Sequence, residues 1–173
     1  MKNIRELKAN EISCRVGQIN EKGLTLLLYK DARVDMDILD ETFGSMNWKK
    51  EYTIDNKNCI VSIYDEDKKE WVSKEDTGTE SNSEAEKGLA SDSFKRACVN
   101  WGIGRELYTA PFVWIGKDKV NLSEKNGKWT TYDKFYVEKI AYKDKVITGL
   151  AIKNQDNKRV FVYSEVKKNE DNK

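Results

Sequence analysis

The stretch Trp71–Trp114, WVSKEDTGTESNSEAEKGLASDSFKRACVNWGIGRELYTAPFVW, decides the fold. Its pattern predicts a strand, a turn-rich connector, one long helix, a glycine stop and an apolar exit segment. Ser81 and Glu84 have the spacing of a capping box at the start of the helix. Gly102 and Gly104 are placed to end it, because glycine adopts the left-handed conformation found at helix C-termini.

The long helix, expected over Ser83–Trp101, is amphipathic. Its apolar residues recur at i, i+4, i+7, i+8 and i+11 and form one face: Ala90, Phe94, Ala97, Cys98 and Trp101. At about 100° per residue, Lys95 and Arg96 point away from that face. Two adjacent cations in this position are either part of an ordinary solvated surface or a binding site for an anion, and periodicity alone favours the solvated surface.

The remaining hydrophobic pattern predicts an α+β protein with a curved antiparallel β-sheet packed by one long helix and an additional C-terminal β-meander. A short helix is expected over Asp35–Phe43, ended by Gly44. The expected strands are Glu11–Gly17, Gly23–Lys30, Trp48–Ile54, Cys59–Tyr64, Glu70–Glu75, Phe135–Tyr142, Val146–Lys153 and Arg159–Tyr163. The last three form the meander, which either extends the main sheet or makes an appendage.

Composition limits the possible functions. Charged residues make up 35% of the 173 residues, yet 31 Lys+Arg against 30 Asp+Glu leave a net charge of only +1. Any nucleic-acid binding therefore requires cations that cluster in space. The chain has no histidine and no P-loop motif, which argues against an enzyme driven by ATP or by a histidine base. We expect no enzymatic activity and no cofactor.

No metal, redox or membrane signal stands out. The three cysteines are far apart without a CxxC motif, so we expect reduced thiols, with Cys98 in the core. Asp37 and Glu41 share a helix face, which would suit Mg²⁺ in a nuclease, although a solvated face is the simpler interpretation. No apolar signal segment or 18-residue apolar run occurs, so we expect a cytoplasmic protein that does not enter the membrane.

Two ordered blocks of the sequence resemble the Rad52 family of single-strand annealing proteins, including its phage members. The first is EDTG followed by EAEKGLASDSFKRACVNWGIGREL, and the second, upstream, is EISCRVGQINEKGLTLLLYKDARVDMDILDETFGSMNW. The family positions matched in order are Glu11, Ile12, Arg15, Arg33, Val34, Glu41, Phe43, Gly44 and Trp48, then Glu86, Lys87, Asp92, Phe94, Lys95, Arg96, Ala97, Trp101 and Gly102. The resemblance covers roughly residues 6 to 115.

The resemblance implies a β-β-β-α core, a homo-oligomeric ring and an outer groove that binds single-stranded DNA. It implies phosphate binding by Lys95 and Arg96 and, from the facing strand, by Arg15. Weaker candidates for DNA contact are Tyr29, Lys30, Arg33, Lys87 and Arg105. The first three could clamp the strand or simply pack and solvate the hairpin. Lys87 alternatively covers the edge of the core with its stem, and Arg105 alternatively bonds the last carbonyls of the helix. Val99 stands where eukaryotic members carry a further groove arginine.

These observations lead to one functional hypothesis and one rival. The hypothesis is ATP-independent annealing of complementary DNA strands in recombination and repair, with a single-strand DNA-binding protein as a further candidate partner. We expect a single-strand annealing core over 1–115, a loop over 116–134, the meander over 135–163 as part of the same domain, and a flexible tail over 164–173. The rival is an oligomeric interaction protein of the same fold without a DNA function, which the near-zero net charge favours.

Overall fold

The computed structural model describes residues 2–79 and 85–165, with the side chains of 85–87 excluded. The chain forms two compact units. Unit 1 contains Met1–Glu6 and Lys30–Arg105, and unit 2 contains Leu7–Tyr29 and Glu106–Lys173. Residues 1–115, where the sequence predicts the annealing core, therefore contribute to both units.

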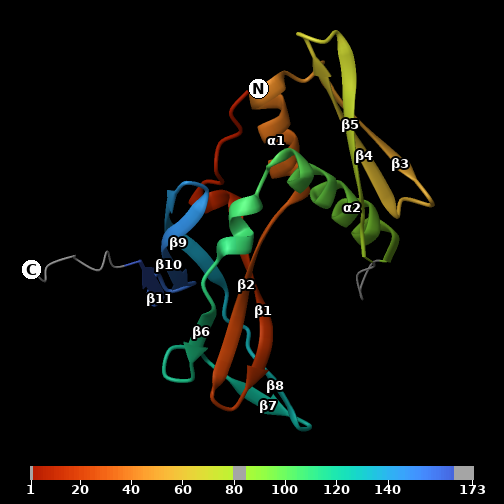
Figure 1. Ribbon diagram of the computed structural model, residues 1–173. Helices are drawn as coiled ribbons and strands as arrows, with labels where there is room; N and C mark the ends of the chain where they lie inside the picture. The colour runs from red at the N-terminus through yellow and green to blue at the C-terminus, as the bar shows by residue number, and fades with distance from the viewer. Residues whose placement is uncertain (1, 80–84, 166–173) are drawn as a thin grey trace, which may run out of the picture. The chain divides into compact units, whose positions relative to one another are not determined.

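Unit 1 holds the β-β-β-α arrangement. Its elements are α1 (Ala32–Phe43), β3 (Trp48–Thr53), β4 (Asn58–Asp65), β5 (Glu70–Thr77) and α2 (Ala85–Trp101). The three strands form an antiparallel sheet in the order β3-β4-β5, and α2 packs against β4 and β5 (Figure 1). The predicted strands and long helix are confirmed here.

The apolar face of α2 and one side of the sheet form the core of unit 1. Six of its buried side chains are Cys59, Val61 and Ile63 on β4 and Phe94, Ala97 and Cys98 on α2. The alternation along β4 places Cys59, Val61 and Ile63 on the same side, as expected for a strand with period two. The ring of Trp48 stacks on Phe94 with centroids 6.2 Å apart, which adds β3 to the same core.

Helix α1 begins earlier than the sequence pattern indicated. We expected it to start at Asp35, but it starts at Ala32, because the Asp31 carboxylate caps the helix by accepting a hydrogen bond from the Arg33 backbone. Asp35 is thereby inside the helix and fully buried. Gly44, with φ of 87°, ends α1 as predicted.

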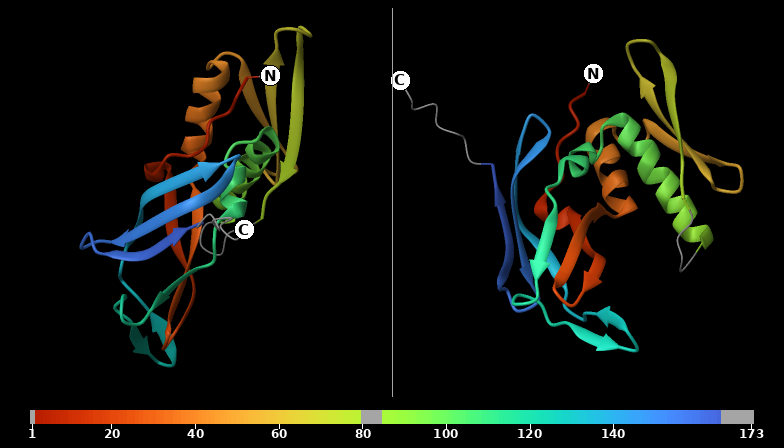
Figure 2. Two further views of the ribbon diagram at one scale, coloured as in Figure 1. Left: turned by 60° about the vertical axis from the view of Figure 1, so that its left-hand side comes forward. Right: turned by 60° about the horizontal axis from the view of Figure 1, so that its bottom comes forward.

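Unit 2 is built on a six-stranded sheet with the order β11-β10-β9-β1-β2-β6. Its elements are η1 (Ala9–Glu11), β1 (Ile12–Asn20), β2 (Gly23–Lys30), η2 (Arg105–Thr109), β6 (Val113–Gly116), β7 (Ser123–Lys125), β8 (Lys128–Thr130), β9 (Phe135–Lys143), β10 (Val146–Asn154) and β11 (Arg159–Ser164); β2 and η2 each share one terminal residue with unit 1. The three blue strands of the predicted meander run side by side (Figure 2). β9 pairs with β1 at Ser13 and Tyr136, so the meander joins the sheet that contains β1 and β2, whereas the sheet packed by α2 is the separate one of β3, β4 and β5.

The segment 116–134, expected to be a loop, contains a short hairpin. β7 and β8 pair around Asn126 and Gly127, whose φ angles are 54° and 75°. An Asn-Gly pair with positive φ at both positions is typical of a tight hairpin turn, and this signal was present in the sequence.

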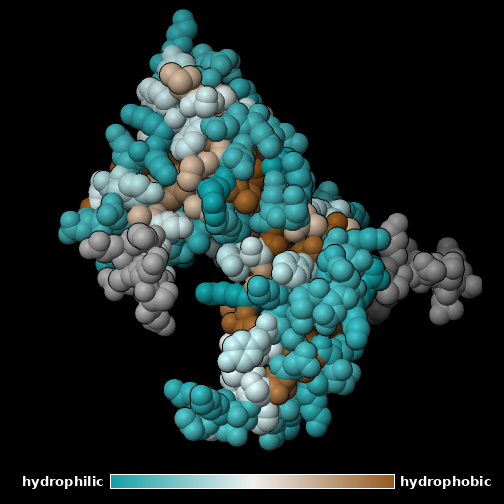
Figure 3. All heavy atoms as spheres, turned by 180° about the vertical axis from the view of Figure 1, so that it is seen from behind, coloured by the Kyte–Doolittle hydropathy of each residue, from teal (hydrophilic) through white to brown (hydrophobic). Residues whose placement is uncertain are grey.

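Other expectations fall partly outside the described residues. Those on Ser81, Ser83 and Glu84 lie outside them, and so does the tail from 166 onward, whereas Ser164 still belongs to β11. All three cysteines are free, and burial raises the pKa of the Cys59 thiol to about 11. No helix in the described ranges has the length and apolar character needed to span a membrane. The face in Figure 3 is largely hydrophilic, in keeping with the high charge content.

Candidate nucleic-acid interface

Helix α2 is held in one rotational setting on the sheet of unit 1. Phe94, Ala97 and Cys98 are buried, and the indole Nε1 of Trp101 donates a hydrogen bond to the Val61 carbonyl at 3.0 Å. The backbone amide of Gly102 donates a hydrogen bond to the Val99 carbonyl. Gly102 has a φ of 106°, which a helix does not accommodate, so α2 ends before it. The residues between the buried positions are therefore fixed on the outer side of α2.

Lys95 and Arg96 lie on this outer side. Lys95 is half-buried and makes no hydrogen bond or ion pair with any residue that the structure describes. The Arg96 guanidinium is exposed, and its Nε lies 3.4 Å from Oδ1 of Asp76. That distance is at the long end for a hydrogen bond, and exposed pairs are worth only about 0–1 kcal/mol. Both cations are thus available to an external anion.

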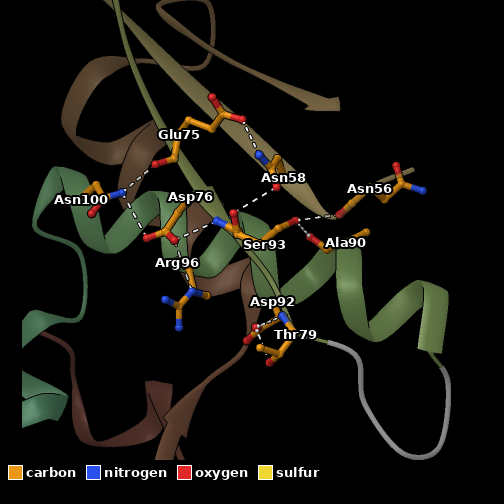
Figure 4. A network of polar contacts seen from close by, with 11 residues as sticks. Asn56, Asn58, Glu75, Asp76, Thr79, Ala90, Asp92, Ser93, Arg96 and Asn100 are labelled. Atoms are coloured by element: carbon orange, nitrogen blue, oxygen red, sulfur yellow. Dashed lines mark hydrogen bonds and ion pairs between the residues drawn. The ribbon is translucent and has the colours of Figure 1, made fainter. Parts of the chain in front are cut away.

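Asp76, at the end of β5, is shared between Arg96 and Asn100. The Asn100 side-chain amide donates to the other Asp76 oxygen at 3.2 Å and to the Glu75 carbonyl at 3.1 Å. Figure 4 shows Asp76 between the two α2 side chains. The carboxylate therefore keeps its bond to Asn100 if Arg96 turns toward a phosphate.

The start of α1 adds a further cation to the neighbourhood of Lys95. Arg33 is exposed and ion-paired with Asp31 at 3.1 Å. The bond from Arg33 holds the pKa of Asp31 below its usual value, and the charge of Lys95 lowers it further. Since Lys95 acts on the same carboxylate that binds Arg33, the two cations share one region of unit 1.

Lys30 has a different environment from the other cations. Its ammonium is only 5% exposed and forms an ion pair with the fully buried Asp35. A side chain on Gly104 would collide with the Lys30 stem, so the glycine that follows α2 also makes room for this lysine. Lys30 was a weaker candidate for contact with the DNA strand, and its buried, paired ammonium instead fits the alternative that it packs within the protein.

Arg105 bonds the last carbonyls of the long helix, which is the alternative to DNA contact that the sequence allowed. Its Nε donates to the Val99 carbonyl and its Nη2 to the Asn100 carbonyl, both at 2.8 Å. These are terminal carbonyls of α2, which carry the negative end of the helix dipole. The Arg105 guanidinium stays exposed, but two of its donors are used at the end of the helix.

The two remaining described candidates belong to unit 2. Arg15 is exposed on β1 and has no hydrogen bond or ion pair within the described ranges. Tyr29 lies near the end of β2 and is 41% exposed. The side chain of Lys87, in the first turn of α2, lies outside what the structure describes.

Two cations near α2 were missed by the sequence analysis. The Lys50 ammonium lies 4.5 Å from the Phe94 ring centroid, and the Lys74 ammonium lies 4.5 Å from that of Trp101. Lys74 also donates to the Asn100 carbonyl at 2.8 Å. Strand alternation was the available signal, because Lys50 and Lys74 are both paired with the buried residue Val61 and so face the helix.

One member of the acidic pair considered for Mg²⁺, Glu41, is bound to an arginine. Both carboxylate oxygens of Glu41 accept hydrogen bonds from the Arg5 guanidinium, at 2.6 and 3.2 Å. Among the described residues, no group of three or more His, Cys, Asp or Glu side chains is arranged to hold a metal ion.

Comparisons with known proteins identify the family of this chain. Residues 3–128 match the family model described as Rad52/22 family double-strand break repair protein. A curated relative, the single-stranded DNA-binding protein DdrA of Deinococcus radiodurans, is 32% identical over 103 residues, which is 58% of this chain and 49% of the relative. The chain thus spans about half the length of that relative. No solved structure matches. Because the family model covers most of the chain, this protein belongs to the Rad52/22 family of double-strand break repair proteins.

Proposed function

We propose that the protein binds single-stranded DNA and anneals complementary strands without ATP, as a homo-oligomeric ring that acts in recombination and repair. The observation that carries the proposal is the pair Lys95 and Arg96 on the outer side of a helix fixed by its buried face. Lys95 forms no hydrogen bond or ion pair with a described residue, and Arg96 has only a long ion pair with Asp76. An anion with two or more oxygens can bind both without disturbing the core.

The proposed mechanism requires no bond to be made or broken, and hence no catalytic residue or cofactor. Lys95 and Arg96 bind two successive phosphates. Arg33 releases its exposed partner Asp31 and binds a third phosphate. Arg15 contributes a cation from unit 2. A strand held by its backbone keeps its bases free to pair with a second strand.

The remaining candidates have unequal support. Tyr29 is exposed and suited to stacking on a base, while Arg105 has only part of its guanidinium available. Lys87 stays a proposal on the family motif alone. Lys30 is better assigned as a positioning residue, because its buried pair with Asp35 ties the start of α1 to the preceding strand.

The name of the DdrA relative supports binding to single-stranded DNA, and family membership supports a role in break repair. We extend the proposal to the annealing core over 1–115, to a cytoplasmic location and to a single-strand DNA-binding protein as a further partner. A ring of subunits would align many phosphate-binding helices along one strand, which makes modest contacts in each subunit sufficient.

The proposal predicts binding that weakens steeply with salt. Four phosphate contacts per subunit, at Lys95, Arg96, Arg33 and Arg15, correspond to a slope of log K against log[salt] of about −3, since single strands release roughly 0.7 counterions per neutralised phosphate. Fluorescence anisotropy of a labelled oligothymidylate between about 50 and 300 mM salt measures this slope. Failure of the wild-type protein to bind at the lowest salt would reject the proposal and favour the oligomeric interaction protein.

A further inference from the structure

Unit 2 contains an open cavity with a mixed polar and apolar lining, of which the proposed function has used only Tyr29. Its volume is about 790 Å³, within the range of about 300–1,000 Å³ typical of ligand sites. It lies beside the start of β1, the start of β9 and the end of β10, elements that can be followed in Figure 1. Its lining includes Ser13, Tyr29, Lys134, Tyr136 and Lys153.

Strand register places three of these side chains in one row. Ser13 is opposite Tyr136 across the β1–β9 pair, and Tyr136 is opposite Lys153 across the β9–β10 pair. Directly opposed residues of antiparallel strands project to the same side of a sheet. Arg15 lies two residues from Ser13 on β1 and therefore projects to that side as well. The row thus joins the cavity to a cation already proposed to bind DNA.

The lining combines aromatic rings with cations. Tyr136 is 47% exposed and Tyr29 is 41% exposed, which is high for rings that border a cavity. Lys134 is exposed, and the Lys153 ammonium donates to the neutral side chain of Asn157 at 2.8 Å. Neither lysine forms an ion pair with a described residue, although the charge of Lys153 contributes to lowering the pKa of Glu138, whose carboxylate is paired with Arg159.

One carboxylate, Asp133, also lines the cavity, and its oxygens are occupied. It accepts hydrogen bonds from the Asn121 backbone at 2.7 Å, from the Asn121 side chain at 3.0 Å and from Gln155 at 3.0 Å. The lining thus has two lysines and one carboxylate, and that carboxylate is hydrogen-bonded to amide groups of Asn121 and Gln155. A ligand with a flat ring and a negative charge matches this lining.

We propose that this cavity binds one nucleotide of a single-stranded DNA, with its base stacked on Tyr136 and its phosphate at Lys153 and Lys134. The inference rests on the proposed function and extends it, because it adds Tyr136 as a second base contact beside Tyr29 and two lysines as further phosphate contacts. Tyr29 forms the second aromatic wall, and Arg15 binds the next phosphate along the strand.

This contact lies in a part of the chain that the family model does not reach. Lys134, Tyr136 and Lys153 all follow residue 128, where the match ends. The meander then has a function beyond extending the sheet: it supplies two strands of a nucleotide site whose third strand, β1, belongs to the family region. A strand bound there would have one base held and its neighbours free.

The test separates stacking from charge with single substitutions. Tyr136→Ala should weaken binding to an oligothymidylate by about fivefold or more, as loss of one stacked base does, and leave the salt slope unchanged. Tyr136→Phe should bind within about twofold of wild type, because the ring is kept. Lys153→Ala should weaken binding and reduce the magnitude of the salt slope by about 0.7, the effect of losing one phosphate contact.

A matched control is available on β9 and in the segment just before it. Tyr132→Ala/Lys139→Ala removes one exposed tyrosine and one exposed lysine that do not line the cavity. This double variant should bind oligothymidylate like wild type. An oligonucleotide carrying 5-iododeoxyuridine should photocrosslink to Tyr136 in the wild-type protein, which gives a readout that does not depend on any variant folding.

The outcomes are distinguishable from those of the proposed function. Wild type that binds oligothymidylate, together with Tyr136→Ala and Lys153→Ala variants that bind equally well and no crosslink at Tyr136, would overturn this inference and leave the α2 site intact. Thymidine monophosphate bound as tightly as the oligonucleotide would also overturn it, in favour of a free-nucleotide site. Wild type that binds no single-stranded DNA would remove both proposals.

Discussion

The variant Lys95→Ala/Arg96→Ala is expected to lose affinity for single-stranded DNA by about a hundredfold or more, because hydrogen bonds to charged groups contribute about 1.5–3 kcal/mol each. The fold should be unaffected, since both side chains lie on the outer side of α2 and Arg96 has only an exposed ion pair. Anisotropy of a labelled oligothymidylate at about 100 mM salt measures the loss, and circular dichroism and sizing confirm an unchanged protein.

Asp76→Asn is the matched control for this double variant. It removes the carboxylate that faces Arg96 while leaving both cations in place and keeping a side chain that bonds Asn100. Its affinity for single-stranded DNA should equal or exceed that of wild type, because Arg96 no longer has to leave the Asp76 carboxylate to bind a phosphate. If Lys95→Ala/Arg96→Ala bound single-stranded DNA as tightly as wild type, the DNA site would have to lie elsewhere than on α2.

The second large effect is expected at Lys30. Lys30→Met should lower the free energy of unfolding by about 3–5 kcal/mol at pH 8, the usual consequence of leaving one partner of a buried ion pair without the other. Asp35 is fully buried, so its carboxylate has no access to water once the ammonium is gone. Urea unfolding followed by tryptophan fluorescence measures the change.

The destabilisation should depend on pH in a defined direction. Burial raises the pKa of Asp35 to about 6, while the charge of Lys30 opposes that rise. Without Lys30 the pKa of Asp35 rises further, so the folded variant binds a proton that the unfolded chain, with an ordinary carboxyl pKa of about 3.9, does not. The variant should therefore be more stable at pH 5 than at pH 8, and its deficit relative to wild type should be smaller at pH 5.

A compensating substitution provides the control. Lys30→Met/Asp35→Leu replaces the pair by two apolar side chains and should recover most of the lost stability, since buried pairs exchanged for hydrophobic residues are often neutral. A deficit of Lys30→Met that is equal at pH 5 and pH 8 would show that the lysine contributes by packing alone.

Unit 1 was largely predictable from the sequence because its signals are local. The spacing of Ala90, Phe94, Ala97 and Cys98 fixes the buried side of α2, and the structure confirms that the last three are almost completely buried. That same spacing placed Lys95 and Arg96 outside. In unit 2, the Asn-Gly turn of the β7–β8 hairpin was also a local signal in the sequence. It was missed because the residues around it are polar.

What the sequence did not indicate depends on tertiary contacts. Lys30 follows a run of strand residues and precedes a charged segment, so nothing local distinguishes it from a surface cation; only the capped start of α1 brings Asp35 onto its ammonium. Tyr136 and Lys153 are 17 positions apart, and a register shift between Ala151 and Ile152 lies beside their pairing. A pattern of alternating residues does not predict such a shift.

Annealing of two complementary labelled oligonucleotides, in the absence of nucleotide, tests the central claim most directly. Wild-type protein should accelerate duplex formation strongly over the spontaneous reaction at about 100 mM salt, and Lys95→Ala/Arg96→Ala at the same concentration and oligomer size should not. Wild-type protein that leaves the annealing rate unchanged while it remains folded would contradict the account, and the family fold would then serve a purpose other than strand annealing in this protein.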